Sequence, residues 1–182
     1  ALKGLIPAKI FTENGLTRFQ VNRRNNTEAE LGATTTTNGP NDYAVPVLKV
    51  TDRKDNIMAV AFGYACHATV LSATQWSGDY PGFAQVALEK MYPGATAMFF
   101  QGAGANQNPL PRRSIPLAKK YGKELAVAVE NVLNEEMKPL ASTLKTTYAE
   151  VNLELNAPPS NEVLEKMIKE STGHYQRWAK MM

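Results

Sequence analysis

The residue in this sequence best suited to carry chemistry is His67, which follows an apolar run from Ile57 to Cys66. A neutral imidazole can bind zinc through a ring nitrogen or act as a general base. The alternative is a core histidine that hydrogen-bonds to a backbone carbonyl. The loop after His67 contains Thr69, Ser77 and Asp79 and is too polar to be core, which favours a functional role.

Asp79 follows His67 in the same loop, and it lies just before an expected helix. Its carboxylate could accept a hydrogen bond from the His67 ring and so orient a catalytic or metal-binding imidazole. The same position suits a residue that only caps the helix. Both interpretations are open at the level of sequence.

A second polar loop also follows an apolar run: it extends from Gly102 to Pro109, after Ala95 to Phe100. Gly102 and Gly104 would let the backbone approach a ligand closely, and successive N–H groups there could stabilise an oxyanion. An ordinary glycine-rich connector is the alternative. The loop matches neither a phosphate-binding loop nor a dinucleotide fingerprint. Because both loops follow expected buried strands, we expect them to converge on one site.

Other reactive or charged residues fit structural roles at least as well. Arg112 and Arg113 could bind an anionic group of a substrate, or could lie solvated on the surface. Cys66 is the only cysteine, so the chain has no internal disulfide and no cysteine-based metal cluster, and we expect a buried structural thiol. His174 is expected at the surface or at an interface. Neither HExxH nor CxxC occurs.

Composition limits the possible partners. The 182 residues carry a formal net charge of +3, with basic and acidic residues mixed along the chain. This pattern argues against a nucleic-acid partner, which would favour a clustered basic surface. The sequence contains no apolar segment long enough to span a membrane.

Hydrophobic periodicity and turn residues predict the elements that must position these loops. An apparent Asn-Gly turn predicts a hairpin, and Pro158-Pro159 separates a terminal helix capped by Ser160 from the rest. In chain order we predict strands Leu5–Phe11 and Leu16–Val21 in a hairpin over Glu13-Asn14-Gly15, a polar loop Asn22–Asn41, strands Val45–Thr51 and Ile57–Cys66, helix Tyr80–Lys90, strand Ala95–Phe100, helix Ser114–Met137 with Ser114 as N-cap, a half-exposed strand Thr143–Leu155, and the terminal helix.

This order predicts an α/β fold, with a mixed β-sheet layered with α-helices. The strand, helix and strand from Ile57 to Phe100 read as a right-handed parallel crossover. We expect residues 1–182 to form a single α/β domain that is a fragment of a longer domain.

Four short motifs occur in a fixed order along residues 15–135. They are Asn22-Arg23, Val47-Leu48, His67-x-Thr69 with Ser77-Gly78-Asp79-x-x-Gly82, and Ala105-Asn106-Gln107-Asn108-Pro109-Leu110. In these motifs and their order the chain resembles the N-terminal domain of the neutral/alkaline non-lysosomal ceramidase family. The last motif corresponds to the family's hexapeptide Gly-Asp-Val-Ser-Pro-Asn.

Members of that family are zinc amidases that cleave the N-acyl bond of ceramide. The resemblance therefore implies a zinc cofactor with His67 as a ligand. The family's other ligands, an upstream histidine and a downstream glutamate and tyrosine, have no counterpart in this chain, so we expect the remaining part of the same protein to supply them.

The resemblance also indicates partners and a location. We expect a small-molecule or lipid substrate, with Asn22, Arg23, Gly102 and Gly104 as binding residues, and contact with a membrane surface. Family members suggest an extracytoplasmic location, either secreted or periplasmic.

The hexapeptide departs from the family pattern where the chemistry is expected. Asn108 stands in place of the family's nucleophilic serine, and Asn106 in place of its aspartate. Asparagine cannot act as the same nucleophile. We therefore name Asn106, Asn108 and Asp79 as the catalytic candidates, with the two amides polarising a carbonyl that a zinc-bound water attacks.

Three hypotheses follow for function. The first is a zinc-dependent, ceramidase-like hydrolase that cleaves an amide or related acyl bond. The second is a non-catalytic relative that binds lipid or glycan and kept the fold without the nucleophile. The third is an α/β scaffold whose polar loops only connect its elements.

Overall fold

The structure is a computed structural model that describes residues 4–29, 31 and 36–182. Contacts between Cα atoms divide the chain into two compact units, Ala1–Thr143 and Leu144–Met182, where the sequence analysis expected one domain. The larger unit holds every candidate residue except His174. That this unit belongs to a longer domain stays a prediction.

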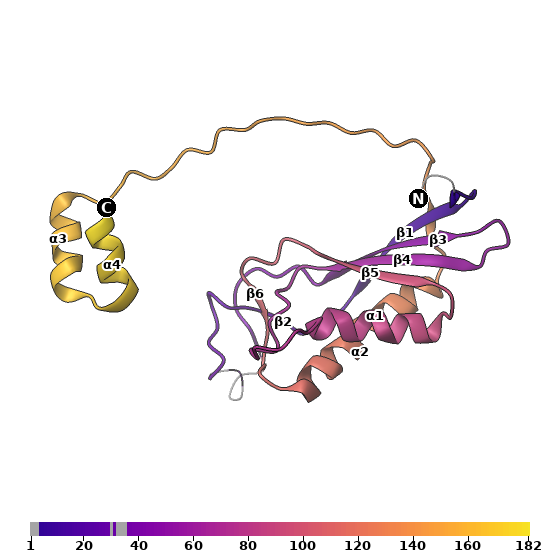
Figure 1. The fold of residues 1–182 in the computed structure, drawn as a ribbon, viewed down its shortest axis with the longest axis horizontal. Coiled ribbons are helices and arrows are strands. Elements are labelled where there is room, and N and C mark those ends of the chain that lie inside the picture. Colours follow the sequence, from indigo (N-terminus) through magenta and orange to yellow (C-terminus); the bar gives the residue numbers. More distant parts are fainter. Residues whose placement is uncertain (1–3, 30, 32–35) are drawn as a thin grey trace. The chain divides into compact units, whose positions relative to one another are not determined.

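The larger unit is built on a five-stranded mixed sheet in the order β5-β4-β3-β1-β7 (Figure 1). Neighbouring strands are antiparallel except β4 and β5, which are parallel. The strands are β1 Lys9–Leu16, β3 Ala44–Thr51, β4 Ile57–Tyr64, β5 Thr96–Gln101 and β7 Lys138–Pro139. The predicted α/β class and the parallel crossover are confirmed.

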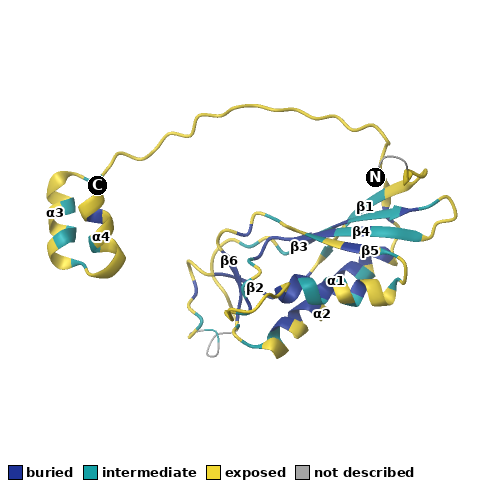
Figure 2. Cartoon of the chain, in the orientation of Figure 1, coloured by how far each residue is buried: buried dark blue, intermediate teal, exposed yellow. Residues whose placement is uncertain are grey.

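Two helices, α1 Asp79–Met91 and α2 Ile115–Leu133, lie on the same face of this sheet, and Figure 2 shows their buried sides turned toward it. Ser114 is the N-cap of α2, as predicted, because its hydroxyl oxygen accepts a hydrogen bond from the Leu117 N–H. Phe19 packs between Tyr64, Tyr80 and Tyr121 in the core, with ring centroids 4.7–5.0 Å apart.

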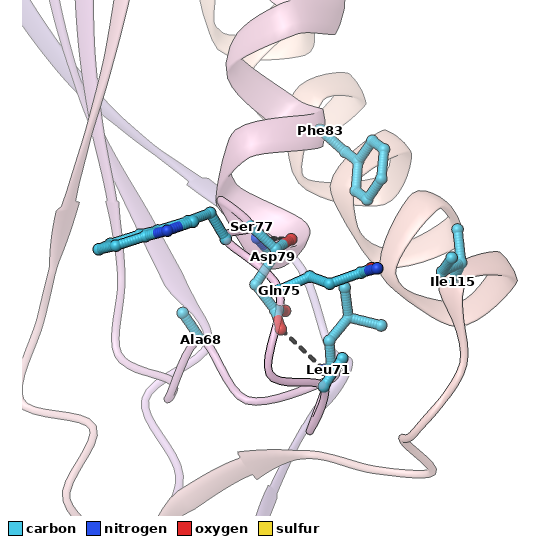
Figure 3. A pocket seen from close by; sticks show the side chains of 9 residues that line it. Ala68, Leu71, Gln75, Ser77, Asp79, Phe83 and Ile115 are labelled. Atoms are coloured by element: carbon cyan, nitrogen blue, oxygen red, sulfur yellow. Dashed lines mark hydrogen bonds between the residues drawn. The ribbon is translucent and has the colours of Figure 1, made fainter.

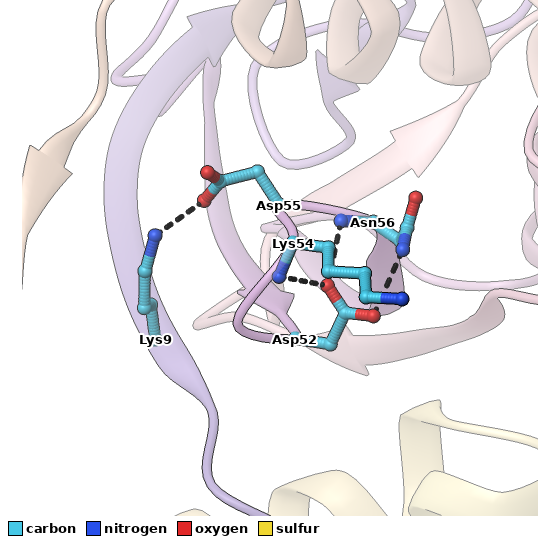
Figure 4. A network of polar contacts seen from close by, with 5 residues as sticks. All are labelled: Lys9, Asp52, Lys54, Asp55 and Asn56. Atoms are coloured by element: carbon cyan, nitrogen blue, oxygen red, sulfur yellow. Dashed lines mark hydrogen bonds and ion pairs between the residues drawn. The ribbon is translucent and has the colours of Figure 1, made fainter.

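The turn between β3 and β4 is fixed by one carboxylate (Figure 4). Asp52 accepts hydrogen bonds from the Lys54 N–H, the Asn56 N–H and the Asn56 side-chain amide, at 2.7–2.9 Å. The side-chain hydrogen bond from Asn56 contributes most to lowering the pKa of Asp52. Asp55 in the same turn pairs with Lys9 at 2.7 Å, which ties the turn to β1.

The edge strand β5 is protected by side chains of α1. Gln85 Nε2 donates to the Ala97 carbonyl at 2.8 Å, and the Ala97 N–H donates to Glu89 Oε1 at 3.1 Å. These bonds satisfy backbone groups that an open sheet edge would offer to another strand.

The predicted N-terminal hairpin is wrong. Strand β1 continues through Asn14 and Gly15, which pair with Pro46 and Val45 of β3. Gly15 is required by packing instead of by a turn: a Cβ there would lie 2.8 Å from Val132 Cγ2 on α2. The next strand, β2 (Gln20–Asn22), leaves the main sheet and pairs with β6 (Gln107–Pro109).

The C-terminal predictions are only partly confirmed. Residues 143–155 form no strand and are exposed, because a strand needs a hydrogen-bonded neighbour and the described residues provide none there. Ser160 caps a helix as predicted, but the helical region is divided into α3 (Asn161–Glu170) and α4 (Gly173–Met181), separated near Gly173, which has a φ of 64°.

Part of the predicted polar loop 22–41 lies outside the described residues. Among the helices that the structure describes, none combines the length and the apolar character needed to cross a membrane.

The crossing of α1 and α2 makes a first prediction. A Cβ at Gly122 would lie 2.5 Å from Phe83 Cβ and 2.8 Å from the Tyr80 carbonyl oxygen, and neither atom can move without moving a helix. We expect Gly122→Ala to lower the free energy of unfolding by about 1–3 kcal/mol in urea denaturation.

Gly82→Ala is the matched control, since a Cβ at Gly82 of α1 meets nothing within 4 Å. It should leave stability unchanged or raise it by up to about 1 kcal/mol, because alanine is the better helix former. Equal effects of the two substitutions would contradict this account of the crossing.

Candidate functional site

The two loops singled out in the sequence meet beyond the carboxyl ends of the parallel strands β4 and β5. The loop after β4 carries His67, and the loop after β5 leads into β6. The Gly102 N–H donates to the Tyr64 carbonyl at 3.1 Å, and the His67 N–H donates to the Gln107 carbonyl at 3.1 Å. The predicted convergence of the loops is therefore present.

The orientation of the His67 ring is set by the Gln107 carbonyl. His67 Nδ1 lies 2.8 Å from that oxygen, which can only accept a hydrogen bond. Nδ1 must therefore carry the proton, and in the neutral ring Nε2 keeps its lone pair. A backbone carbonyl on the second ring nitrogen is the usual arrangement for a metal-binding histidine, and it also satisfies a purely structural one. The ring is half-buried.

Asp79 holds the loop instead of the His67 ring. Its carboxylate accepts hydrogen bonds from the N–H groups of Val70, Leu71 and Tyr80, at 2.7–3.2 Å (Figure 3 shows the bond to Leu71). The residue is buried and has a φ of 52°, a conformation rare outside glycine. The group that orients His67 is thus the Gln107 carbonyl, and Asp79 joins the loop to the start of α1.

The two glycines serve packing between the loops. A Cβ at Gly104 would lie 2.7 Å from the Cys66 backbone nitrogen, and one at Gly102 would lie 3.3 Å from Ala65 Cα. The Gly104 N–H donates to the Gly102 carbonyl at 2.7 Å. Since the N–H groups of Gly102 and Gly104 already have partners, neither is free to stabilise an oxyanion.

Strands β2 and β6 bring the two asparagine-containing motifs together. Val21 pairs with Asn108, and the Arg23 N–H donates to the Asn106 carbonyl at 2.8 Å. Arg23 also donates from its guanidinium to the Ala105 carbonyl at 3.1 Å. Residues more than eighty positions apart in sequence therefore form one edge of the site.

The asparagines of this edge differ in burial and in the hydrogen bonds that their side chains form. Asn22 is buried, accepts from the Arg24 N–H and donates to the Pro40 carbonyl, so both ends of its amide are used within the fold. Asn106 is exposed, and its Oδ1 accepts from Arg24 Nε at 3.3 Å. Asn108 is buried where β6 pairs with Val21 of β2.

Gln107 connects both loops, although no role was predicted for it from the sequence. Its carbonyl binds His67, its Nε2 donates to the Pro40 carbonyl at 2.8 Å, and its Oε1 is buried without a partner in the described part of the chain. The Thr69 hydroxyl is likewise buried and unpartnered. The only sequence signal for Gln107 was its place inside the hexapeptide.

Arg112 and Arg113 are tied to Glu28 and are not a free anion site. Arg113 Nη1 lies 2.5 Å from Glu28 Oε2, the Arg112 N–H donates to Glu28 Oε1 at 3.2 Å, and Arg112 Nε lies 3.7 Å from Oε2. Burial would raise the pKa of Glu28, but the hydrogen bonds and charges of the two arginines together lower it. The Arg113 N–H also donates to the Val70 carbonyl, which fixes the loop after His67.

Cys66 is the buried structural thiol that the sequence predicted. It is fully buried, and burial raises the pKa of its thiol far above neutrality. Burial similarly raises the pKa of Tyr80, whose hydroxyl donates to the Cys66 carbonyl at 2.8 Å. Neither group ionises near neutral pH, so neither supplies a nucleophile or a general base.

A pocket of about 370 Å³ lies beside the loop after β4, and Ala68, the residue that follows His67, is part of its lining (Figure 3). Its wall is mixed, with apolar side chains from the loop and from both helices around the Asp79 carboxylate. The lining residues are Ala68, Leu71, Ala73, Gln75, Trp76, Ser77, Asp79, Phe83 and Ile115.

The donor set for zinc is incomplete in the described residues. No group of three or more histidine, cysteine, aspartate or glutamate side chains capable of holding a metal ion occurs among them. A zinc site needs at least three protein ligands. His67 alone therefore fits as one ligand, and a metal would need further ligands from elsewhere.

Comparisons with known proteins support the fold. No protein-family model matches the sequence, and no curated protein matches it significantly. Two solved structures are similar, a ceramidase complexed with C2 (TM-score 0.63) and the neutral ceramidase from Pseudomonas aeruginosa (TM-score 0.60), each at 17% identity. Each match covers 75% of this chain and 24% of the ceramidase chain, so the matched region spans about a quarter of those proteins. The chain has a ceramidase-like fold, as the resemblance implied.

The second prediction concerns the stability that the hydrogen bonds of Asp79 provide. Asp79→Ala would leave three backbone N–H groups without their acceptor, two of them on the buried residues Val70 and Tyr80. We expect the free energy of unfolding to fall by about 2–4 kcal/mol, measured by urea denaturation.

Asp42→Ala is the control, because Asp42 is exposed and its carboxylate accepts one backbone hydrogen bond, from the Ala44 N–H. It should cost less than about 1 kcal/mol. Unchanged stability in Asp79→Ala would contradict the view that its carboxylate holds the loop.

Proposed function

We propose that this chain is part of a zinc-dependent hydrolase that cleaves an amide or related acyl bond. The observation that supports this most is the hydrogen bond from His67 Nδ1 to the Gln107 carbonyl. With the proton on Nδ1, Nε2 of this half-buried ring keeps a lone pair that can bind zinc. The ceramidase-like fold is the second support, since one of the similar structures is named as a neutral ceramidase.

His67 would supply one zinc ligand through Nε2. The remaining ligands would come from other parts of the same protein, because the described residues contain no group able to complete the site. When bound, zinc supplies a Lewis acid for an acyl carbonyl and lowers the pKa of a water molecule.

The chain's own residues would bind and orient the acyl group. The buried Asn108 amide would donate a hydrogen bond to a carbonyl oxygen of the substrate. Asn106 is fixed less firmly, through Arg24, and would contact the substrate from the exposed side. Each such donor typically contributes about a hundredfold or more in kcat when it acts on a developing oxyanion.

The Asn108 position also shapes the chemistry proposed. An asparagine amide can donate a hydrogen bond but cannot form the covalent intermediate that a serine at this position would form. The proposed reaction therefore proceeds by direct attack of water on the acyl carbon, and it releases a carboxylic acid and an amine or alcohol.

Metal content tests the proposal through His67. We expect about one zinc per chain in the purified full-length protein. His67→Ala should lose both the zinc and the ability to hydrolyse an N-acyl amide. His174→Ala is the matched control, because the sequence has two histidines and the second lies in α4 of the smaller unit.

A full-length protein that binds no zinc would contradict the proposal and favour the non-catalytic lipid- or glycan-binding alternative. Equal metal loss in both variants would also contradict it. The unfolding midpoint of His67→Ala in urea separates loss of a ligand from loss of the fold.

A further inference from the structure

The pocket beside His67 has an aromatic side chain at its rim that the proposed chemistry does not use. Trp76 is fully exposed, and it shares the pocket lining with Phe83 and the exposed Ile115. The ring of a tryptophan is apolar with one polar N–H, which makes it well suited to the boundary between a polar and an apolar phase.

A second hollow adjoins this pocket through Phe83. It measures about 470 Å³ and lies between α1 and α2, with an apolar floor that includes Ala87, Met91 and Val127. Phe83 lines both hollows, so they form one surface. We call it the α1–α2 face, defined by Trp76, Phe83, Ile115 and Val127 together with the lysines that rim the second hollow.

The rim of the second hollow is positively charged. Lys90, Lys119 and Lys123 line it, against one acidic residue, Glu130. Within the part of the chain that the structure describes, none of these three lysines forms an ion pair, whereas Lys120 on a neighbouring side of α2 pairs with Glu124. The rim therefore carries cationic charge that its own fold does not neutralise.

We propose that the α1–α2 face docks on the surface of an anionic lipid bilayer. Trp76 and Ile115 would enter the headgroup boundary while the three lysines contact anionic headgroups, the combination by which peripheral proteins bind membranes. The lysine side chains have apolar stems that can lie on the same boundary. Charge complementarity and the exposed tryptophan together favour a bilayer over an acidic protein.

This inference rests on the proposed function and extends it. Docking by this face would bring the pocket beside His67 to the bilayer surface, where a lipid amide would be found. It does not depend on hydrolysis. Membrane binding can therefore be present in a protein without activity, and activity on a soluble amide can be present without membrane binding.

Sedimentation with vesicles tests the proposal on the full-length protein. We expect binding to vesicles of phosphatidylcholine with phosphatidylserine and little binding to phosphatidylcholine alone. The double variant Lys119→Gln/Lys123→Gln should bind the anionic vesicles at least ~10-fold more weakly, since each lysine near such a surface contributes ~5-fold. Trp76→Ser should weaken binding to a similar degree.

The matched control removes the same charge elsewhere. Lys120→Gln/Lys138→Gln alters two exposed lysines outside the α1–α2 face and should bind as the unaltered protein does. All substituted side chains are exposed, and thermal unfolding of each variant verifies that the fold is intact.

Tryptophan fluorescence identifies which part of the chain inserts. The difference between the emission of the unaltered protein and that of Trp76→Phe isolates the signal of Trp76. Its emission should shift to shorter wavelength on anionic vesicles. No vesicle binding, binding retained by the Trp76 and lysine variants, or binding lost in Trp178→Ser but not in Trp76→Ser would each overturn the proposal.

Discussion

The carbonyl oxygen of Gln107 accepts hydrogen bonds from both the backbone N–H and Nδ1 of His67, and the candidate site depends on it. That oxygen is positioned by the pairing of β6 with β2 and by the Gln107 side chain, which is anchored to Pro40. The same oxygen sets the tautomer of His67. A backbone group thus links the strand ladder, the loop after β4 and the chemistry proposed for the imidazole.

Close backbone packing is what allows this arrangement. Gly104 lies where a Cβ would be 2.7 Å from the Cys66 nitrogen, and Gly122 lies where one would be 2.5 Å from Phe83 Cβ. The first contact brings the two loops together, and the second brings α1 and α2 together beneath the sheet. Asp79 connects these layers, because its carboxylate holds the loop after His67 while its backbone begins α1.

Elements with a strong local pattern could be predicted from the sequence, and elements that depend on a distant partner could not. The helices α1 and α2 and the strands β3, β4 and β5 follow from periodicity and capping. Asn14-Gly15 has the composition of a turn, but its glycine is selected by contact with α2, which no local pattern reveals. The alternation in residues 143–155 likewise fits a strand, yet a strand forms only beside another. In the site, the predicted meeting of the loop after β4 with the loop after β5 is present, whereas the pairing of β2 with β6 beside Asn22 and Arg23 was not predicted. The role of Gln107 was missed because a backbone carbonyl leaves no mark on residue type.

The central claim is that the Gln107 carbonyl holds His67 with its proton on Nδ1 and its lone pair on Nε2. The ¹⁵N chemical shifts of the His67 ring measure this directly, with its signals assigned by their absence in His67→Gln. We expect the neutral ring to carry its proton on Nδ1 and none on Nε2, with the Nε2 resonance moving when zinc is added to the full-length protein. A ring that is protonated on Nε2, or whose Nε2 signal ignores zinc, would contradict it.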